Sequence, residues 1–208
     1  MKQALSYFLG MALSAFFANA DDKTVNWPQF RGPGALGIAE GAETPTAWDV
    51  PAGKNLKWKV PIPGLGHSCP VVWGDRIFLT TAISDREKDS LKIGIYHEIA
   101  PVENDGVHVW KLFCIDKKTG KVLWETVCHK GVPKDKRHTK SSHANCTPAT
   151  DGKRVVTFFG SEGLYCHDFE GKLLWKRDFG ILDAAFFRVP RAQWGFASSP
   201  VIHEGVVL

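Results

Sequence analysis

LFCIDKKTGKVLW at residues 112–124 returns as LYCHDFEGKLLW at residues 164–175, with a single gap between the two copies. Each copy places a cysteine before an aspartate, then a Gly-Lys pair, and then a run that ends in tryptophan. Two short apolar runs joined by a tight turn with Asp and Gly are typical of a β-hairpin. The copies therefore predict two hairpins of the same design, each with a tryptophan at the end of its second strand.

A second type of hairpin precedes each copy and begins with a small residue and a proline. The proline is followed by an apolar run, an Asp/Gly turn and a β-branched run. These hairpins start at Pro70 and Pro148, and a third starts at Pro200. Two hairpins in a unit of roughly 40–50 residues give four short strands, which is the pattern of a β-propeller blade. A β-sandwich with accidental similarity is the alternative.

The sequence thus predicts an all-β protein, a β-propeller of four-stranded blades that is incomplete in this chain. The first unit carries an insertion from about Ala82 to Lys111, a stretch that is short in the second unit. A lone strand around Leu56 to Val60 precedes the two full units, and half a unit at 196–208 follows them. Because propellers have about 4–8 blades, we expect this chain to be the N-terminal part of a ring, one of seven or eight blades.

The composition is that of a folded protein, since 44% of the residues are hydrophobic and 12% are aromatic. This content excludes disorder. The formal net charge of +4 is mild, and it gives no support to a nucleic-acid partner, which needs a concentrated basic face.

The N-terminus has the pattern of a secretory signal peptide. Lys2 precedes an apolar run, and Ala18-Asn19-Ala20 offers the small residues that a signal peptidase reads. A transmembrane anchor is the alternative, but the run is short for a bilayer. We therefore expect a signal peptide at 1–20, an extended segment at 21–53 and the partial propeller at 54–208, in a periplasmic or secreted protein with no transmembrane segment after cleavage.

Five cysteines in an exported protein raise the possibility of disulfides. The count is odd and no C-x-x-C motif is present. Cys114 and Cys166 occupy matching positions of the repeat, which favours small buried strand residues over a disulfide framework.

The pattern C-x-D-…-G-K-x-L-W resembles the PQQ-like (pyrroloquinoline-quinone-type) propeller repeat. NWPQFRGPG at 26–34, PGLGHSCP at 63–70, RHTKSSHAN at 137–145 and WGFASSP at 194–200 are similar to exported bacterial proteins with this repeat. The resemblance implies structural roles for ten residues. Tryptophans would dock between neighbouring blades, Asp and Gly would form the turns, and Pro would mark the first strand of each unit. These residues are Trp58, Trp124, Trp175, Asp116, Asp168, Gly120, Gly171, Pro70, Pro148 and Pro200.

The resemblance implies an exported, non-catalytic binding or scaffold module whose partner is a protein or another envelope component. It is similar at repeat level to the propeller subunit of the outer-membrane protein assembly machinery, although this chain lacks the lipid-accepting cysteine of that subunit. The alternative is a PQQ-dependent oxidoreductase with its cofactor residues mainly beyond Leu208. PQQ with Ca²⁺ would need adjacent cysteines and acidic ligands. The chain has no Cys-Cys pair, and Glu98 and Glu103 to Asp105 lie in the inserted loop without Ca²⁺-ligand spacing.

One loop-rich stretch gathers residues that can bind zinc, but in a spacing that matches no familiar site. Nearby lysines and an arginine favour a solvated basic loop, which could attract an anionic partner. No hydrolytic triad is indicated. A third possibility is carbohydrate binding or cleavage at the mouth of the ring, with a tryptophan stacked on sugar. The zinc candidates are Cys128, His129, His138, His143 and Cys146, and the sugar candidates are Trp73, Trp110 and Trp194.

Overall fold

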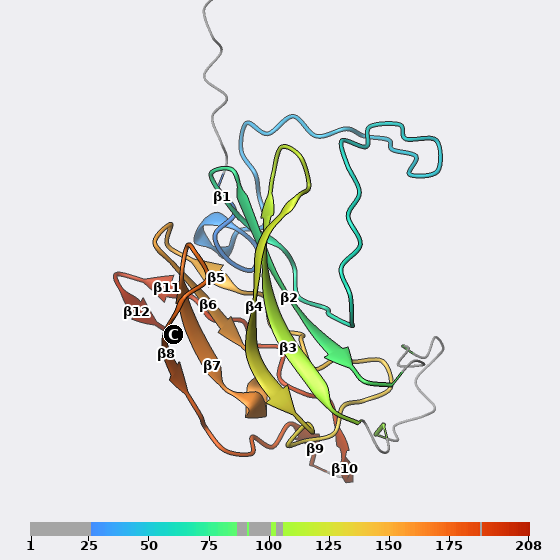
Figure 1. The fold of residues 1–208 in the computed structure, drawn as a ribbon, viewed down its shortest axis with the longest axis vertical. Helices are drawn as coiled ribbons and strands as arrows, with labels where there is room; N and C mark the ends of the chain where they lie inside the picture. Colours follow the sequence, from blue (N-terminus) through green and yellow to red (C-terminus); the bar gives the residue numbers. More distant parts are fainter. Residues whose placement is uncertain (1–25, 87–90, 92–100, 103–105, 188) are drawn as a thin grey trace, which may run out of the picture.

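The computed structural model describes residues 26–86, 91, 101–102, 106–187 and 189–208. In these residues the chain forms two four-stranded antiparallel sheets and two small hairpins (Figure 1), with two short 3₁₀ turns at Pro33–Ala35 and Gly160–Glu162. The all-β class is therefore confirmed. The expected signal peptide lies outside the described residues. In the part of the chain that is described, no helix is long and apolar enough to cross a membrane.

Each of the two full units forms one sheet, with its strands in sequence order. The first sheet contains β1 (Val71–Trp73), β2 (Arg76–Ser84), β3 (His108–Asp116) and β4 (Val122–Gly131). The second contains β5 (Ala149–Thr150), β6 (Arg154–Phe158), β7 (Leu164–Asp168) and β8 (Leu173–Arg177). The small hairpins are β9 (Ala185–Phe186) with β10 (Val189–Gln193), and β11 (Ile202–His203) with β12 (Val206–Val207).

The repeated sequence produces the same pairing in both sheets. Cys114 lies opposite Trp124 across β3 and β4, and Cys166 lies opposite Trp175 across β7 and β8. In each pair the register shifts immediately after the cysteine. Such a shift marks a β-bulge, which bends and twists the strand locally.

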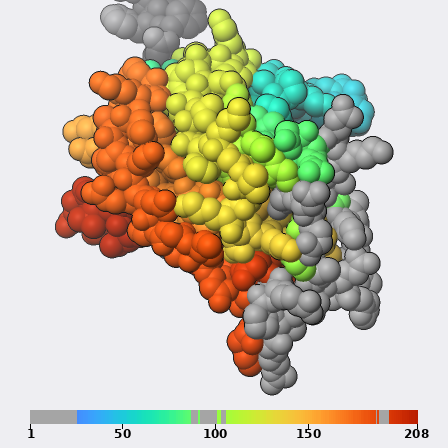
Figure 2. Space-filling view, turned by 60° about the horizontal axis from the view of Figure 1, so that its bottom comes forward, coloured from blue at the N-terminus to red at the C-terminus, as the bar shows by residue number. Residues whose placement is uncertain are grey.

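The core lies between the two sheets, which pack against each other. One cluster joins Phe78, Leu112 and Cys114 of the first sheet to Val155 of the second. A second cluster joins Trp110 to Tyr165 and to neighbouring residues of both units. Both clusters draw residues from both units, so the two sheets stabilise each other. Figure 2 shows segments of the two units next to each other on one face, in yellow and orange.

Two expectations about the elements need correction. The stretch from Leu56 to Val60 forms no strand. The inserted segment is narrower than the expected span from Ala82 to Lys111, because β2 and β3 remain paired as far as Ser84 and His108. The hairpin formed by β9 and β10 is an addition that the sequence analysis did not predict.

The thiols provide a test of this packing. All five cysteines are free, and Cys69 is the one among them that is exposed. Burial raises the pKa of Cys114 and Cys166 to about 11 and that of Cys128 and Cys146 to about 12. Since the thiolate is the reactive form, we expect a thiol reagent at pH 8 to label one cysteine rapidly in the folded protein and all five after denaturation. Mass spectrometry should place the rapid label on Cys69, and rapid labelling that survives in Cys69→Ser would contradict this packing.

His167 on β7 gives the fold an expected dependence on pH. Its side chain is buried, its Nδ1 has no hydrogen-bond partner among the described residues, and burial lowers its pKa to about 4. An unfolded histidine has a pKa of about 6.5, so the unfolded chain takes up the proton first. This contribution to stability is complete above pH 6.5 and is lost as the pH falls towards 4. We expect a loss of about 2 kcal/mol between pH 7 and pH 5.

Urea unfolding at the two pH values measures this effect. His167→Gln should remove most of the difference between pH 7 and pH 5, whereas His203→Gln, at an exposed position, should leave it unchanged. Equal pH dependence in the wild type and His167→Gln would show that His167 is not the group responsible.

Candidate functional site

Trp58 and Trp124 each dock on the hairpin turn of a sheet. Trp58 Nε1 donates to the Lys117 carbonyl at 2.9 Å, and Trp124 Nε1 donates to the Phe169 carbonyl at 3.0 Å. Each acceptor directly follows the aspartate of its turn. Each ring also covers the turn glycine, because an added Cβ would lie 2.5 Å from Trp58 at Gly120 and 2.8 Å from Trp124 at Gly171.

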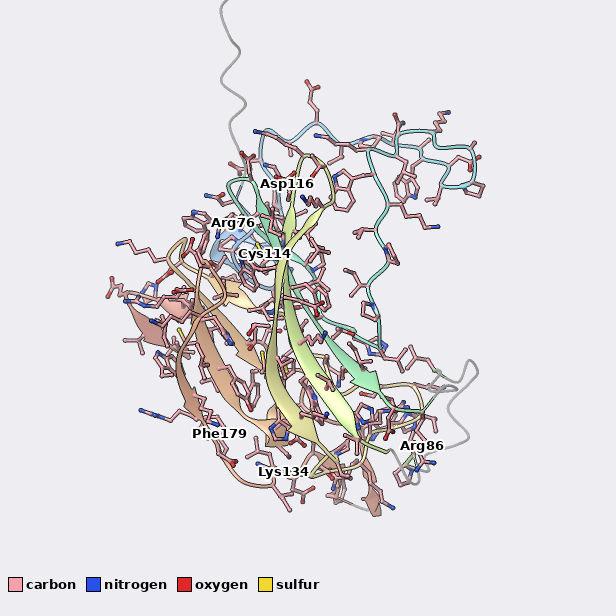
Figure 3. The ribbon with its side chains drawn as sticks, in the orientation of Figure 1. Arg76, Arg86, Cys114, Asp116, Lys134 and Phe179 are labelled. Carbon is pink, nitrogen blue, oxygen red and sulfur yellow. The ribbon has the colours of Figure 1, made fainter. Side chains whose placement is uncertain are left out.

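Asp116 and Asp168 build these turns by accepting hydrogen bonds from the residues that follow them. Asp116 Oδ1 accepts from the Thr119 amide and hydroxyl, both at 2.7 Å, and these bonds lower the pKa of Asp116. Asp168 Oδ1 accepts from the amides of Glu170 and Lys172 at 3.0 and 2.8 Å. Figure 3 shows Asp116 near Arg76 at one end of the sheets, with Lys134 and Phe179 towards the other end. The third docking candidate, Trp175, lies half-buried on β8 with no turn against it among the described residues.

The three residues that precede the repeated prolines are linked in series. The Cys69 amide donates to Thr147 Oγ1 at 3.0 Å, and the Thr147 amide donates to Ser199 Oγ at 2.9 Å. Pro70, Pro148 and Pro200 directly follow these residues. The loops that lead into the first strand of each unit therefore converge on one region of the molecule.

This region contains a cleft with a volume of about 420 Å³. Its walls come from the loop around His67, the segment from Lys140 to Thr147, the segment from Trp194 to Ser199, and Phe30 from the N-terminal segment. The volume lies within the range of small-molecule pockets. Among the described residues that line the cleft, Lys140 is the one side chain with a fixed charge, and there is no carboxylate.

A network centred on Asn145 fixes one wall of the cleft. Asn145 Oδ1 accepts from the Ser142 amide at 3.1 Å and from the Ser142 hydroxyl at 2.9 Å, and it lies 3.1 Å from His67 Nδ1. Because a carbonyl oxygen can only accept, Nδ1 of His67 carries the hydrogen of this bond. When the imidazole is neutral, Nε2 of His67 is then the acceptor, and no described residue forms a hydrogen bond with that atom.

Trp194, which stacks on a buried histidine, forms part of another wall. Trp194 lies parallel to His138, with the ring centroids 4.0 Å apart and an angle of 13° between the planes. His138 is 1% exposed and its Nδ1 accepts from the Lys140 amide at 3.1 Å, whereas Trp194 is 37% exposed. One face of the indole is thus covered by a fixed imidazole, and the side chain still reaches the cleft.

The other two tryptophans suggested for sugar stacking have structural positions. Trp110 is fully buried and donates its indole hydrogen to the His143 carbonyl at 3.0 Å. Trp73 covers Gly152, where an added Cβ would lie 2.4 Å from its ring. Of the three candidates, Trp194 is the one that lines the cleft.

The residues considered for zinc lie in separate environments. His129 pairs with Glu162 at 3.2 Å, and Cys146 donates to the Phe196 carbonyl at 3.2 Å. His143 packs its edge against Trp110. Within the described part of the chain, no three His, Cys, Asp or Glu side chains gather closely enough to hold a metal ion. Glu98 and Glu103 to Asp105 lie outside the described residues.

The sequence analysis did not identify His67 and Asn145 as members of the site, nor Thr147 and Ser199. A signal was present, because Thr147 and Ser199 occupy the same position of the repeat and both carry hydroxyl groups.

Comparisons with known proteins do not identify the family of this chain. No protein-family model matches the chain, and no curated protein matches it.

Proposed function

We propose that the chain forms consecutive blades of a β-propeller in an exported protein of the PQQ-like type, and that this protein is a binding module. The docking of tryptophan on glycine turns supports the propeller. Trp58 sits on the turn of the first sheet, and Trp124 of the first sheet sits on the turn of the second. The same docking arrangement would place Trp175 of the second sheet on the turn of a further unit. Leu174 and Phe179, about half-exposed on and beside β8, would be covered by the same contact.

The cleft carries the proposal that this module binds a ligand. It lies where the loops of successive units converge, and ligand sites occur preferentially at such junctions. The partner would be a component of the cell envelope or of the medium outside the cell, consistent with the expected export signal.

The geometry around His67 favours binding over hydrolysis. A serine nucleophile needs a histidine that accepts its proton. Ser142 Oγ donates instead to Asn145 Oδ1 at 2.9 Å, and His67 Nδ1 already carries a hydrogen. His67 and Ser142 therefore form part of a structural network, and the cleft offers recognition without an activated nucleophile.

A thermal-shift experiment tests the proposal. The ligand panel contains neutral oligosaccharides, nucleotides, amino acids, and PQQ with Ca²⁺. Ala197 lines the cleft, so Ala197→Trp should fill it, while Ala42→Trp places the same ring at an exposed site elsewhere. At least one ligand class should stabilise the wild type and Ala42→Trp but not Ala197→Trp.

The same samples distinguish the oxidoreductase alternative. With PQQ, Ca²⁺, a primary alcohol and an electron-accepting dye, a binding module should leave the dye oxidised. Dye reduction that depends on PQQ would favour the quinoprotein. The binding proposal fails if no ligand in the panel discriminates between Ala197→Trp and Ala42→Trp.

A further inference from the structure

We infer that the ligand of this cleft is a saccharide and that a pyranose ring stacks on the open face of Trp194. The inference rests on the proposed function, because it names the ligand class of the same cleft. It is supported by two features: a fixed aromatic ring, and a set of groups beside it that can form hydrogen bonds with hydroxyls.

Trp194 is held in place before any ligand arrives. The buried His138 ring supports one face of the indole at 4.0 Å, and Ser141 Oγ donates to the Trp194 carbonyl at 2.9 Å. Ser141 Oγ itself accepts from Asn145 Nδ2 at 2.8 Å. Because the indole is already ordered, stacking of a ligand on it costs little side-chain conformational entropy.

The electron-rich face of an indole attracts partial positive charge. The axial C–H groups on one side of a pyranose ring offer such charge across a flat apolar surface, and weak C–H contacts of this kind add to the stacking. A saccharide thus matches the exposed part of Trp194 without needing a charge of its own.

The groups beside the indole can both donate and accept hydrogen bonds. Ser199 Oγ accepts the Thr147 amide, so it retains its own hydroxyl hydrogen to donate. Asn145 Nδ2 uses one of its two hydrogens on Ser141. His67 Nε2 supplies the complementary acceptor.

Sugar hydroxyls suit this mixture because each can donate and accept at once. The cleft also has no carboxylate among its described lining residues, which disfavours cationic ligands. A ligand with an apolar ring face and a rim of neutral hydroxyls satisfies both features together.

Isothermal titration of the whole chain with β-1,4-linked gluco-, manno-, galacto- and xylo-tetraose tests the inference. At least one of these should bind with a Kd below about 1 mM. Trp194→Ala should weaken that binding by about tenfold or more, whereas Trp194→Phe, which keeps an aromatic face, should weaken it less. Trp48→Ala removes a tryptophan that is 68% exposed outside the cleft and should leave the Kd unchanged. Near-ultraviolet circular dichroism establishes that each variant is folded.

Three outcomes would overturn the inference: none of the four tetraoses binds, the affinity survives in folded Trp194→Ala, or adenosine monophosphate or a tetrapeptide displaces the sugar as the tighter ligand. If another ligand class still distinguishes Ala197→Trp from Ala42→Trp, the saccharide assignment falls and the binding module stands. If Ala197→Trp changes nothing for any ligand, both proposals fall.

Discussion

Gly171→Ala is expected to lower the free energy of unfolding by about 2–4 kcal/mol. Gly171 has a φ of +86°, a conformation that costs alanine about 1 kcal/mol. The new Cβ would also lie 2.8 Å from the Trp124 ring. That ring cannot retreat freely, because its Nε1 is bonded to the Phe169 carbonyl and its other contacts include Phe78 at a centroid distance of 6.0 Å. The overlap should therefore separate the sheets or displace the indole.

Gly205→Ala is the matched control for the backbone contribution. Gly205 has a φ of +79°, and an added Cβ there meets no atom within 4 Å. Urea unfolding should show a loss of about 1 kcal/mol for this variant, clearly smaller than the loss for Gly171→Ala. Equal losses in the two variants would mean that contact with Trp124 contributes nothing and that the turn conformation alone sets the cost.

Trp110→Ala is expected to cost about 3–5 kcal/mol. The side chain is completely buried among residues of both sheets, and its removal leaves a cavity that the surrounding strands can fill only in part. It also removes the donor to the His143 carbonyl. Since small domains are stable by only about 5–15 kcal/mol, this one change should bring the protein close to unfolding at room temperature.

The controls for Trp110 separate burial from the loss of any tryptophan. Trp48→Ala, at an exposed position, should change the free energy of unfolding by less than about 0.5 kcal/mol. Trp110→Phe should fall between the two, because it keeps most of the volume but not the hydrogen bond. Native-like stability in Trp110→Ala would show that the second core cluster is not closely packed.

Local features of the fold were predictable from the sequence. The hairpins that contain Asp116 and Asp168 follow from turn chemistry within about a dozen residues, and the repeat required both to have the same register. The burial of Cys114 and Cys166 followed from the same repeat, since matching positions on matching strands face the same side of the sheet.

Features that depend on distant contacts were not predictable in this way. The stretch around Trp58 resembles a strand in sequence, yet it lacks a paired neighbour, and its ring is held by one turn. Trp110 and Trp194 looked equally suited to a ligand, because a sequence does not reveal which side of a strand will be covered by another sheet. The cleft is assembled from four separated segments, and the Asn145 network that links two of them has no local signature.

The docking of Trp124 on Gly171 has a consequence for how such a protein can grow. Each unit carries a ring on its outer strand and a receiving turn between its last two strands. A tandem duplication of the coding segment for one unit would therefore copy both the tryptophan and the receiving turn in a single event. The new unit would fit its neighbours on either side without compensating mutations, so selection could lengthen the array first and diversify the loops around the cleft afterwards.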